Sequence, residues 1–73
     1  MSKRLPTITA VKLLSILEAH GFVRVRQSGS HIILKHGDGR RTTVPMHKGK
    51  DLGRGLLRQI MRDASLSIYD IKN

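Results

Sequence analysis

Apolar residues near the start of the chain recur at intervals of three and four positions, which is the spacing of a helix with one buried stripe. Thr9 precedes this segment with a hydroxyl that can accept from the free amides of a first turn, and Gly21 follows it as a left-handed stop. We therefore predict a helix over residues 10–20, behind an N-terminal arm over residues 1–8. Its core-facing positions are Ala10, Leu13, Leu14 and Leu17.

Beyond this helix the period changes to two, which is the pattern of a half-buried strand. Residues 22–27 alternate apolar with basic side chains after the first position. Val23 and Val25 are therefore expected to face the core. Arg24 and Arg26 are expected on the outer face of the sheet, which would make that face basic.

A Ser-Gly-Ser turn then leads into a second predicted strand over residues 31–36. If Ile32 and Leu34 face the core, His31 points outward with the two arginines. Lys35 then lies on the same outer side. A one-residue slip in register reverses the arrangement and buries His31, so the pattern alone leaves both placements of this histidine open.

The dipeptide Asp38-Gly39 is a hairpin signal because both residues tolerate a positive φ. A third strand is predicted over residues 40–44, ended by Pro45, with Arg41 on the outer face. A basic loop over residues 47–50 follows. The connections between the three strands are short, which favours antiparallel pairing.

A second helix is predicted over residues 53–64, where three arginines recur every four residues away from the apolar stripe. Residues 66–73 form a C-terminal tail in which Ser67 can cap one last helical turn. The apolar stripe of the helix consists of Leu56, Leu57, Ile60 and Met61, and the candidates to dock from the tail are Ile68, Tyr69 and Ile71.

The order of these elements predicts a single α+β domain over residues 1–73. It is a two-layer α-β-β-β-α sandwich, a three-stranded antiparallel sheet with both helices on one face. Double-stranded RNA-binding domains have this topology, although a fold by itself carries function only weakly.

The charge balance points to a polyanionic partner. Fourteen Lys and Arg residues oppose five Asp and Glu residues, which gives a net charge of +9 on a chain of 73 residues. Nucleic acid is the first candidate, an acidic protein the second, and a membrane surface the least favoured. One Phe, one Tyr and no Trp disfavour the aromatic platforms on which single-strand binders stack bases.

Several classes of protein are disfavoured by composition. The chain has no cysteine, so disulfide frameworks and thiolate metal clusters are excluded. The first seven residues, MSKRLPT, lack the apolar run of a signal peptide or membrane span. We expect a soluble, cytoplasmic protein.

Four histidines raise the question of a metal site or a catalytic group. His31 and His36 are five positions apart on one strand, which places them on opposite faces, and few carboxylates are near. We therefore expect no metal, no cofactor and no nucleophilic triad. His20 and His36 are expected to have structural roles.

One enzymatic reaction needs little protein, namely cleavage of RNA by its own 2′-hydroxyl group. The protein must supply a general acid or base and stabilise charge on the phosphate. His31 suits the first task because its ordinary pKa lies near neutrality. The candidate substrate-binding residues around it are Arg24, Arg26, Lys35 and Arg41, with Gly29 for close backbone approach, Ser30 as a hydroxyl donor and His47 as a backbone contact.

The three residues Gly29, Ser30 and His31 can also have purely structural roles. Gly29 then supplies a turn, Ser30 is solvated and His31 ends a strand. Residue chemistry alone slightly favours this second interpretation, because a lone Gly-Ser-His is a weak signal.

A set of ordered motifs resembles the HicA toxin family, also called YcfA-like, over nearly the whole chain. The motifs are Leu5-Pro6, Leu17-Glu18-Ala19-His20-Gly21-Phe22, Arg26-Gln27-Ser28-Gly29-Ser30-His31, Thr43-Val44-Pro45-Met46-His47 and Gly55-Leu56-Leu57-Arg58-Gln59-Ile60. The resemblance implies a type II toxin that cuts mRNA without the ribosome on a fold similar to a double-stranded RNA-binding domain. The histidine of the family's Gly-Ser-His motif falls on His31.

The resemblance also implies partners and shows departures. A HicB antitoxin covers the histidine in such pairs, and operator DNA is bound only through the toxin–antitoxin complex. Leu56 stands where many members have threonine, Ser65 where a glycine is common, and Ile32 where a second histidine often follows the first.

Two hypotheses for function follow. The first is a toxin that acts as a metal-independent endoribonuclease with His31 as its single catalytic residue. The alternative is a non-catalytic module that binds double-stranded RNA or DNA, because one histidine can serve only one of two proton transfers.

Overall fold

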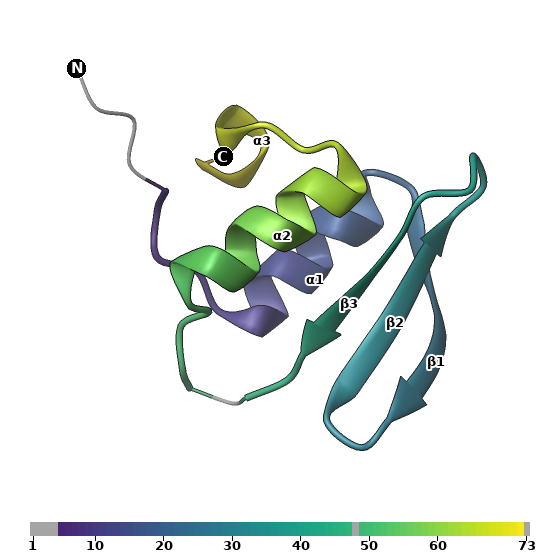
Figure 1. The fold of residues 1–73 in the computed structure, drawn as a ribbon, viewed down its shortest axis with the longest axis horizontal. Helices are drawn as coiled ribbons and strands as arrows, with labels where there is room; N and C mark the ends of the chain where they lie inside the picture. Colours follow the sequence, from purple (N-terminus) through teal and green to yellow (C-terminus); the bar gives the residue numbers. More distant parts are fainter. Residues whose placement is uncertain (1–4, 48, 73) are drawn as a thin grey trace.

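The computed structural model describes residues 5–47 and 49–72. The chain forms α1 (Ala10–Ala19), β1 (Phe22–Ser28), β2 (His31–His36), β3 (Arg41–Pro45), α2 (Arg54–Ala64) and α3 (Ile68–Lys72). The strands make one antiparallel sheet in the order β1-β2-β3, and the helices lie on one side of it (Figure 1). The predicted α+β fold is confirmed. Residues 1–4, 48 and 73 of the predicted arm, loop and tail lie outside the described residues.

The first helix begins and ends as its sequence predicts. The N–H of Lys12 donates to the Thr9 hydroxyl at 3.2 Å, which satisfies one of the free amides of the first turn. Gly21 follows with a φ of 94°, and a Cβ at this position would lie 2.9 Å from Nε2 of His36. Glycine is therefore required here both for the backbone angle and for the space.

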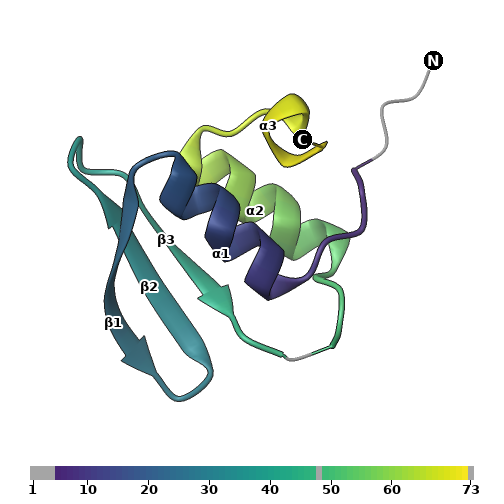
Figure 2. The ribbon, with the colours of Figure 1, turned by 180° about the vertical axis from the view of Figure 1, so that it is seen from behind.

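The core lies between the sheet and the helices, as the view from behind also shows (Figure 2). Ile32, Leu34 and Val44 are buried from the sheet side, which confirms the predicted parity of the second and third strands. Thr42 is 3 % exposed, and its hydroxyl donates to Asp63 at 3.0 Å, as a buried polar group must. From the helices and the tail the core receives Leu13, Leu14, Leu17, Leu57, Ile60, Ala64 and Ile71.

The first strand forms where it was predicted, but the predicted orientation of its valine side chains is wrong. Val23 and Val25 are 61 % and 55 % exposed, whereas Phe22 is buried. Because Phe22 and Arg24 share a parity, burying the larger aromatic side chain turns Val23 outward. The register then shifts between Arg24 and Arg26, which makes Val25 the extra residue of a β-bulge.

The segments around the helix bundle also differ in part from the prediction. Leu56 is exposed, so the buried stripe of α2 runs instead through Leu57, Ile60 and Ala64. In the tail Ile71 is buried, whereas Tyr69 is 63 % exposed. The N–H and hydroxyl of Ser67 both donate to Asp70, at 2.7 and 3.0 Å, so the carboxylate of Asp70 is the acceptor at the start of α3.

None of the helices in the described part of the chain combines the length and the apolar character needed to cross a membrane.

Candidate functional site

His31 is the first residue of β2 and directly follows a two-residue hairpin loop. The loop is Gly29-Ser30, and His31 pairs with Ser28 across it. Gly29 has a φ of 59° at the first loop position, which is the pattern of a type II′ turn and favours glycine. The side-chain amide of Gln27 donates to the Gly29 carbonyl at 3.1 Å. The turn therefore presents an exposed histidine at one end of the sheet.

The third strand holds the other side of this position. Pro45 is the β3 partner of His31, and the N–H of Met46 donates to the Ser30 carbonyl at 2.6 Å. A backbone hydrogen bond therefore joins the first residue after β3 to the Gly29-Ser30 loop. His47 is the next residue and is exposed.

The outer face of the sheet brings most of the predicted site residues together. Directly paired residues in antiparallel strands share a face. The register aligns Arg26 with Ile33 and Thr43, and aligns Val23 with Lys35 and Arg41. Arg26 therefore lies in the row next to His31, roughly 7 Å along the strand, while the row of Lys35 and Arg41 is about twice as far away.

Arg24 is the exception, and its predicted placement beside His31 is wrong. It pairs with Leu34, whose side chain is buried on the helix side of the sheet. Its guanidinium Nε donates to Glu18 of α1 at 3.2 Å. The bulge at Val25 explains the difference, because it places Arg24 and Arg26 on opposite faces although they are two residues apart.

The cations of the outer face have no partners within the described chain. Arg26, Lys35 and Arg41 are exposed, and no described residue forms a hydrogen bond or ion pair with their side chains. Three exposed cations, in two rows across the strands, therefore lie on the same face of the sheet as His31. Such a surface attracts phosphate groups and other anions.

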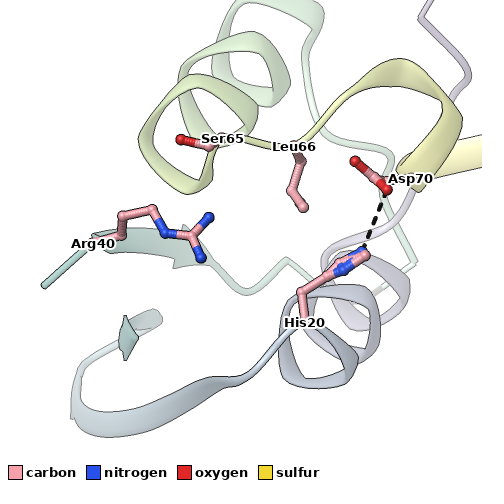
Figure 3. Close-up of a pocket in the computed structure, with 5 residues that line it drawn as sticks. All are labelled: His20, Arg40, Ser65, Leu66 and Asp70. Carbon is pink, nitrogen blue, oxygen red and sulfur yellow. Dashed lines mark ion pairs between the residues drawn. The ribbon is translucent and has the colours of Figure 1, made fainter. Parts of the chain in front are cut away.

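A second group of polar residues lies at the opposite end of the sheet and was missed by sequence reasoning. A pocket of about 280 Å³ is lined by His20, Arg40, Ser65, Leu66 and Asp70 (Figure 3). Nε2 of His20 lies 3.6 Å from Oδ1 of Asp70. Arg40 points into this pocket from the hairpin between β2 and β3.

Arg40 joins the hairpin to the end of α2. Its guanidinium donates to Asp38 at 2.8 Å and to the carbonyl of Ala64, and it stands 5.2 Å from the centre of the Phe22 ring. The ring of His36 meets the same phenylalanine edge to face. These contacts link the hairpin to the end of α2, whereas Nε2 of His20 is buried and forms no hydrogen bond within the described residues.

Two carboxylates at this end are held in their ionised form. The backbone N–H of Arg40, followed by its guanidinium, lowers the pKa of Asp38. The backbone N–H of Ser67, followed by its hydroxyl, lowers the pKa of Asp70. Hydrogen bonds to the charged form favour that form.

Metal-binding geometry is not found in the described part of the chain, because no three His, Asp or Glu side chains come together there. The predictions for Gly29, Ser30, His31 and His47 concern their roles, and these stay predictions.

Comparison with known families gives one match. The family model for the "HicA toxin of bacterial toxin-antitoxin" systems matches residues 11–66. This range includes α1, the whole sheet with His31, and α2. The comparison with curated proteins found no match.

Proposed function

Because this chain belongs to the HicA toxin family of bacterial toxin–antitoxin systems, we propose that it cleaves mRNA as a metal-independent endoribonuclease with His31 as an acid–base group. As the toxin of such a system, it has an antitoxin partner. The observation that carries the proposal is an exposed histidine at the end of a sheet face whose cations have no partner in the described chain.

The chemistry matches these few groups. In RNA the 2′-hydroxyl is the nucleophile, so the protein needs only to move a proton and to stabilise negative charge on the phosphate. The imidazole of His31 is the kind of side chain that most often acts as a general acid or base. Arg26 in the neighbouring row supplies positive charge to the phosphate oxygens, and Lys35 and Arg41 hold the flanking phosphates.

The turn before His31 supports close approach of the substrate. A Cβ at Gly29 would have no atom within 4 Å, so this backbone is open to the solvent. A phosphate can therefore approach the loop, and the Ser30 hydroxyl can donate to one of its oxygens. In this proposal Gly29 and Ser30 bind the scissile phosphate next to His31.

The same face is proposed to bind the antitoxin. An acidic HicB-type protein that covers the outer face neutralises its charges and blocks His31, which inhibits the toxin in the cytoplasm. Binding to operator DNA is then a property of the complex, since the basic face of the toxin is occupied.

A labelled RNA oligonucleotide incubated with the purified protein in EDTA tests the cleavage reaction. We expect cleavage with a 2′,3′-cyclic phosphate and a 5′-hydroxyl as products. The control is the same oligonucleotide with a single 2′-deoxy nucleotide at the cleavage position, which should stay intact. Cleavage of the deoxy substrate, or activity that EDTA abolishes, would contradict the mechanism.

The second candidate is a non-catalytic module for double-stranded RNA or DNA. The order of its elements and its unpartnered cations favour this alternative. It predicts salt-dependent binding to the oligonucleotide without any cleavage. The same incubation therefore separates the two functions.

A further inference from the structure

Cleavage of RNA by its own 2′-hydroxyl requires two proton transfers, and His31 can perform one of them at a time. The base must accept the proton of the 2′-hydroxyl, and the acid must protonate the 5′-oxygen that leaves. Whether the described chain offers a second group depends on what lies beside His31 at the end of the sheet. His47 is the titratable side chain that the backbone brings there.

The backbone pairing places His47 next to the hairpin loop. His31 pairs with Pro45, and the N–H of Met46 donates to Ser30 at 2.6 Å. This hydrogen bond holds Met46, the first residue after β3, against the loop. His47 is the next residue of the chain, two positions beyond the strand partner of His31, so both histidines lie toward the same end of the sheet.

His47 is exposed, unlike the two residues before it. Pro45 is buried, and Met46 packs against the core. The imidazole of His47 is therefore open to the solvent, on a segment that a backbone hydrogen bond joins to the loop before His31.

The segment that carries His47 is anchored at both ends. Before it, Met46 is bonded to the hairpin loop. After it, the N–H of Lys50 donates to the His47 carbonyl at 3.2 Å, and the N–H of Leu52 donates to Ile8 at 2.8 Å. Such anchoring limits the positions open to the imidazole and helps to preorganise a reacting group.

The four histidines fall into two kinds. His20 lies 3.6 Å from Asp70, and His36 lies 3.1 Å from Asp38. His31 and His47 have no carboxylate partner among the described residues. Among the described residues, the charged groups on the outer face and in the loop are Arg26, Lys35, Arg41, Lys50 and Asp51.

We propose that His47 is the second acid–base group of the reaction, which rests on the proposed ribonuclease function. One histidine takes the 2′-hydroxyl proton while the oxygen lone pair forms the new bond to phosphorus. The bond from phosphorus to the 5′-oxygen breaks with its electron pair on that oxygen, which receives a proton from the other histidine. The products are a 2′,3′-cyclic phosphate and a 5′-hydroxyl, and solvent restores the two protonation states.

The dependence of kcat/KM on pH in His47→Gln tests this role. The wild-type protein should give a bell-shaped profile, and His47→Gln should lose one of its two limbs. We expect kcat to fall by a factor of about 100 or more, with little change in KM. Lys50→Gln is the matched control, because it removes a charge from the same loop and should keep both limbs.

A substrate with a 5′-thio leaving group assigns the two roles, since sulfur leaves without protonation. If this substrate restores cleavage by His47→Gln, His47 is the acid. If it restores cleavage by His31→Gln instead, His31 is the acid and His47 is the base. A His47→Gln protein that keeps both limbs and loses only affinity would overturn the inference while leaving the ribonuclease function intact. A wild-type protein without cleavage activity would overturn both.

Discussion

The two ends of the central strand β2 both carry a histidine, but the side chains around the two histidines differ in their contacts. His31 begins the strand and His36 ends it, each beside a glycine-containing turn. At the His36 end, Asp38 and Arg40 bond to each other and Phe22 contacts both His36 and Arg40. At the His31 end, no described residue forms a hydrogen bond or ion pair with the side chain of the histidine or of the neighbouring Arg26. The side chains of the first group contact one another, whereas those of the second group are exposed and have no partner among the described residues.

The distribution of carboxylates accounts for this contrast. Glu18 binds Arg24 on the helix side, Asp63 binds Thr42, and Asp38 and Asp70 lie at the His36 end. None of these four carboxylates lies on the outer face of the sheet. Unpaired like charges repel one another and lower stability. The cations of the outer face therefore do not stabilise the fold, and they are available to bind anions.

Arg40 and Arg41 are adjacent in the chain but belong to the two different regions. Replacing each with alanine is expected to give the largest difference in stability. Arg40→Ala removes the bonds to Asp38 and Ala64 and the contact with Phe22, and should lower the free energy of unfolding by about 2 kcal/mol. Arg41→Ala, on the outer face, should change it by less than about 0.5 kcal/mol. Urea unfolding of both variants measures the difference. Equal losses would contradict the division of the two regions.

Two arginines of the first strand test the binding face. Arg26→Ala should weaken RNA binding several-fold and lower the slope of log K against log salt by about 0.7, which is one phosphate contact on a single strand. Arg24→Ala should leave the slope unchanged, because this side chain is bound to Glu18 on the helix side. Titrations at three salt concentrations provide the measurement. A larger effect from Arg24 would reverse our assignment of the two faces.

The comparison also shows which features a sequence makes visible. The second and third strands were predicted with the right parity because Ile32, Leu34 and Val44 alternate without competition. In the first strand apolar residues occur on both faces, so the sequence alone does not show which face is buried. Phe22 is the residue that is buried, because of contacts that only the tertiary structure reveals. The bulge at Val25 leaves no local signal, and so the face of Arg24 was wrong.

Long-range contacts set a similar limit at the two sites. The guanidinium of Arg40 donates to the carbonyl of Ala64, which is 24 residues away. No local sequence pattern predicts this contact. His31 was found through its motif, and His47 was assigned only a backbone contact. Its position beside His31 depends on strand pairing, which a sequence does not display.

A smaller effect is expected where α2 ends. Ser65 has a φ of 55° and a ψ of 40°, a left-handed conformation that costs a non-glycine residue about 1 kcal/mol. Ser65→Gly should therefore raise Tm by roughly 5 °C. The matched control is Ser67→Gly, which removes the hydroxyl that donates to Asp70 and should lower Tm. An unchanged or lower Tm for Ser65→Gly would show that this residue is not strained.

The smallest effect concerns acid stability at the same end of the molecule. The pKa of Asp70 is lowered mainly by the N–H of Ser67, so its stabilising contribution is present above its ordinary pKa of about 3.9 and is lost as the pH falls through the lowered value. Asp70→Asn should be less stable than wild type at pH 7, with a difference that shrinks below pH 4 (about the ordinary pKa). Thermal unfolding followed by circular dichroism from neutral to acidic pH measures it. A constant difference would exclude this linkage.

The rates of RNA cleavage by His31→Asn and His36→Asn test the central claim most directly. These histidines occupy the two ends of one strand, and asparagine keeps a polar side chain that cannot transfer a proton near neutral pH. We predict that His31→Asn folds with wild-type stability but cleaves RNA at least about 100-fold more slowly. His36→Asn should be less stable and, when folded, cleave at the wild-type rate. Wild-type cleavage by His31→Asn would contradict the account.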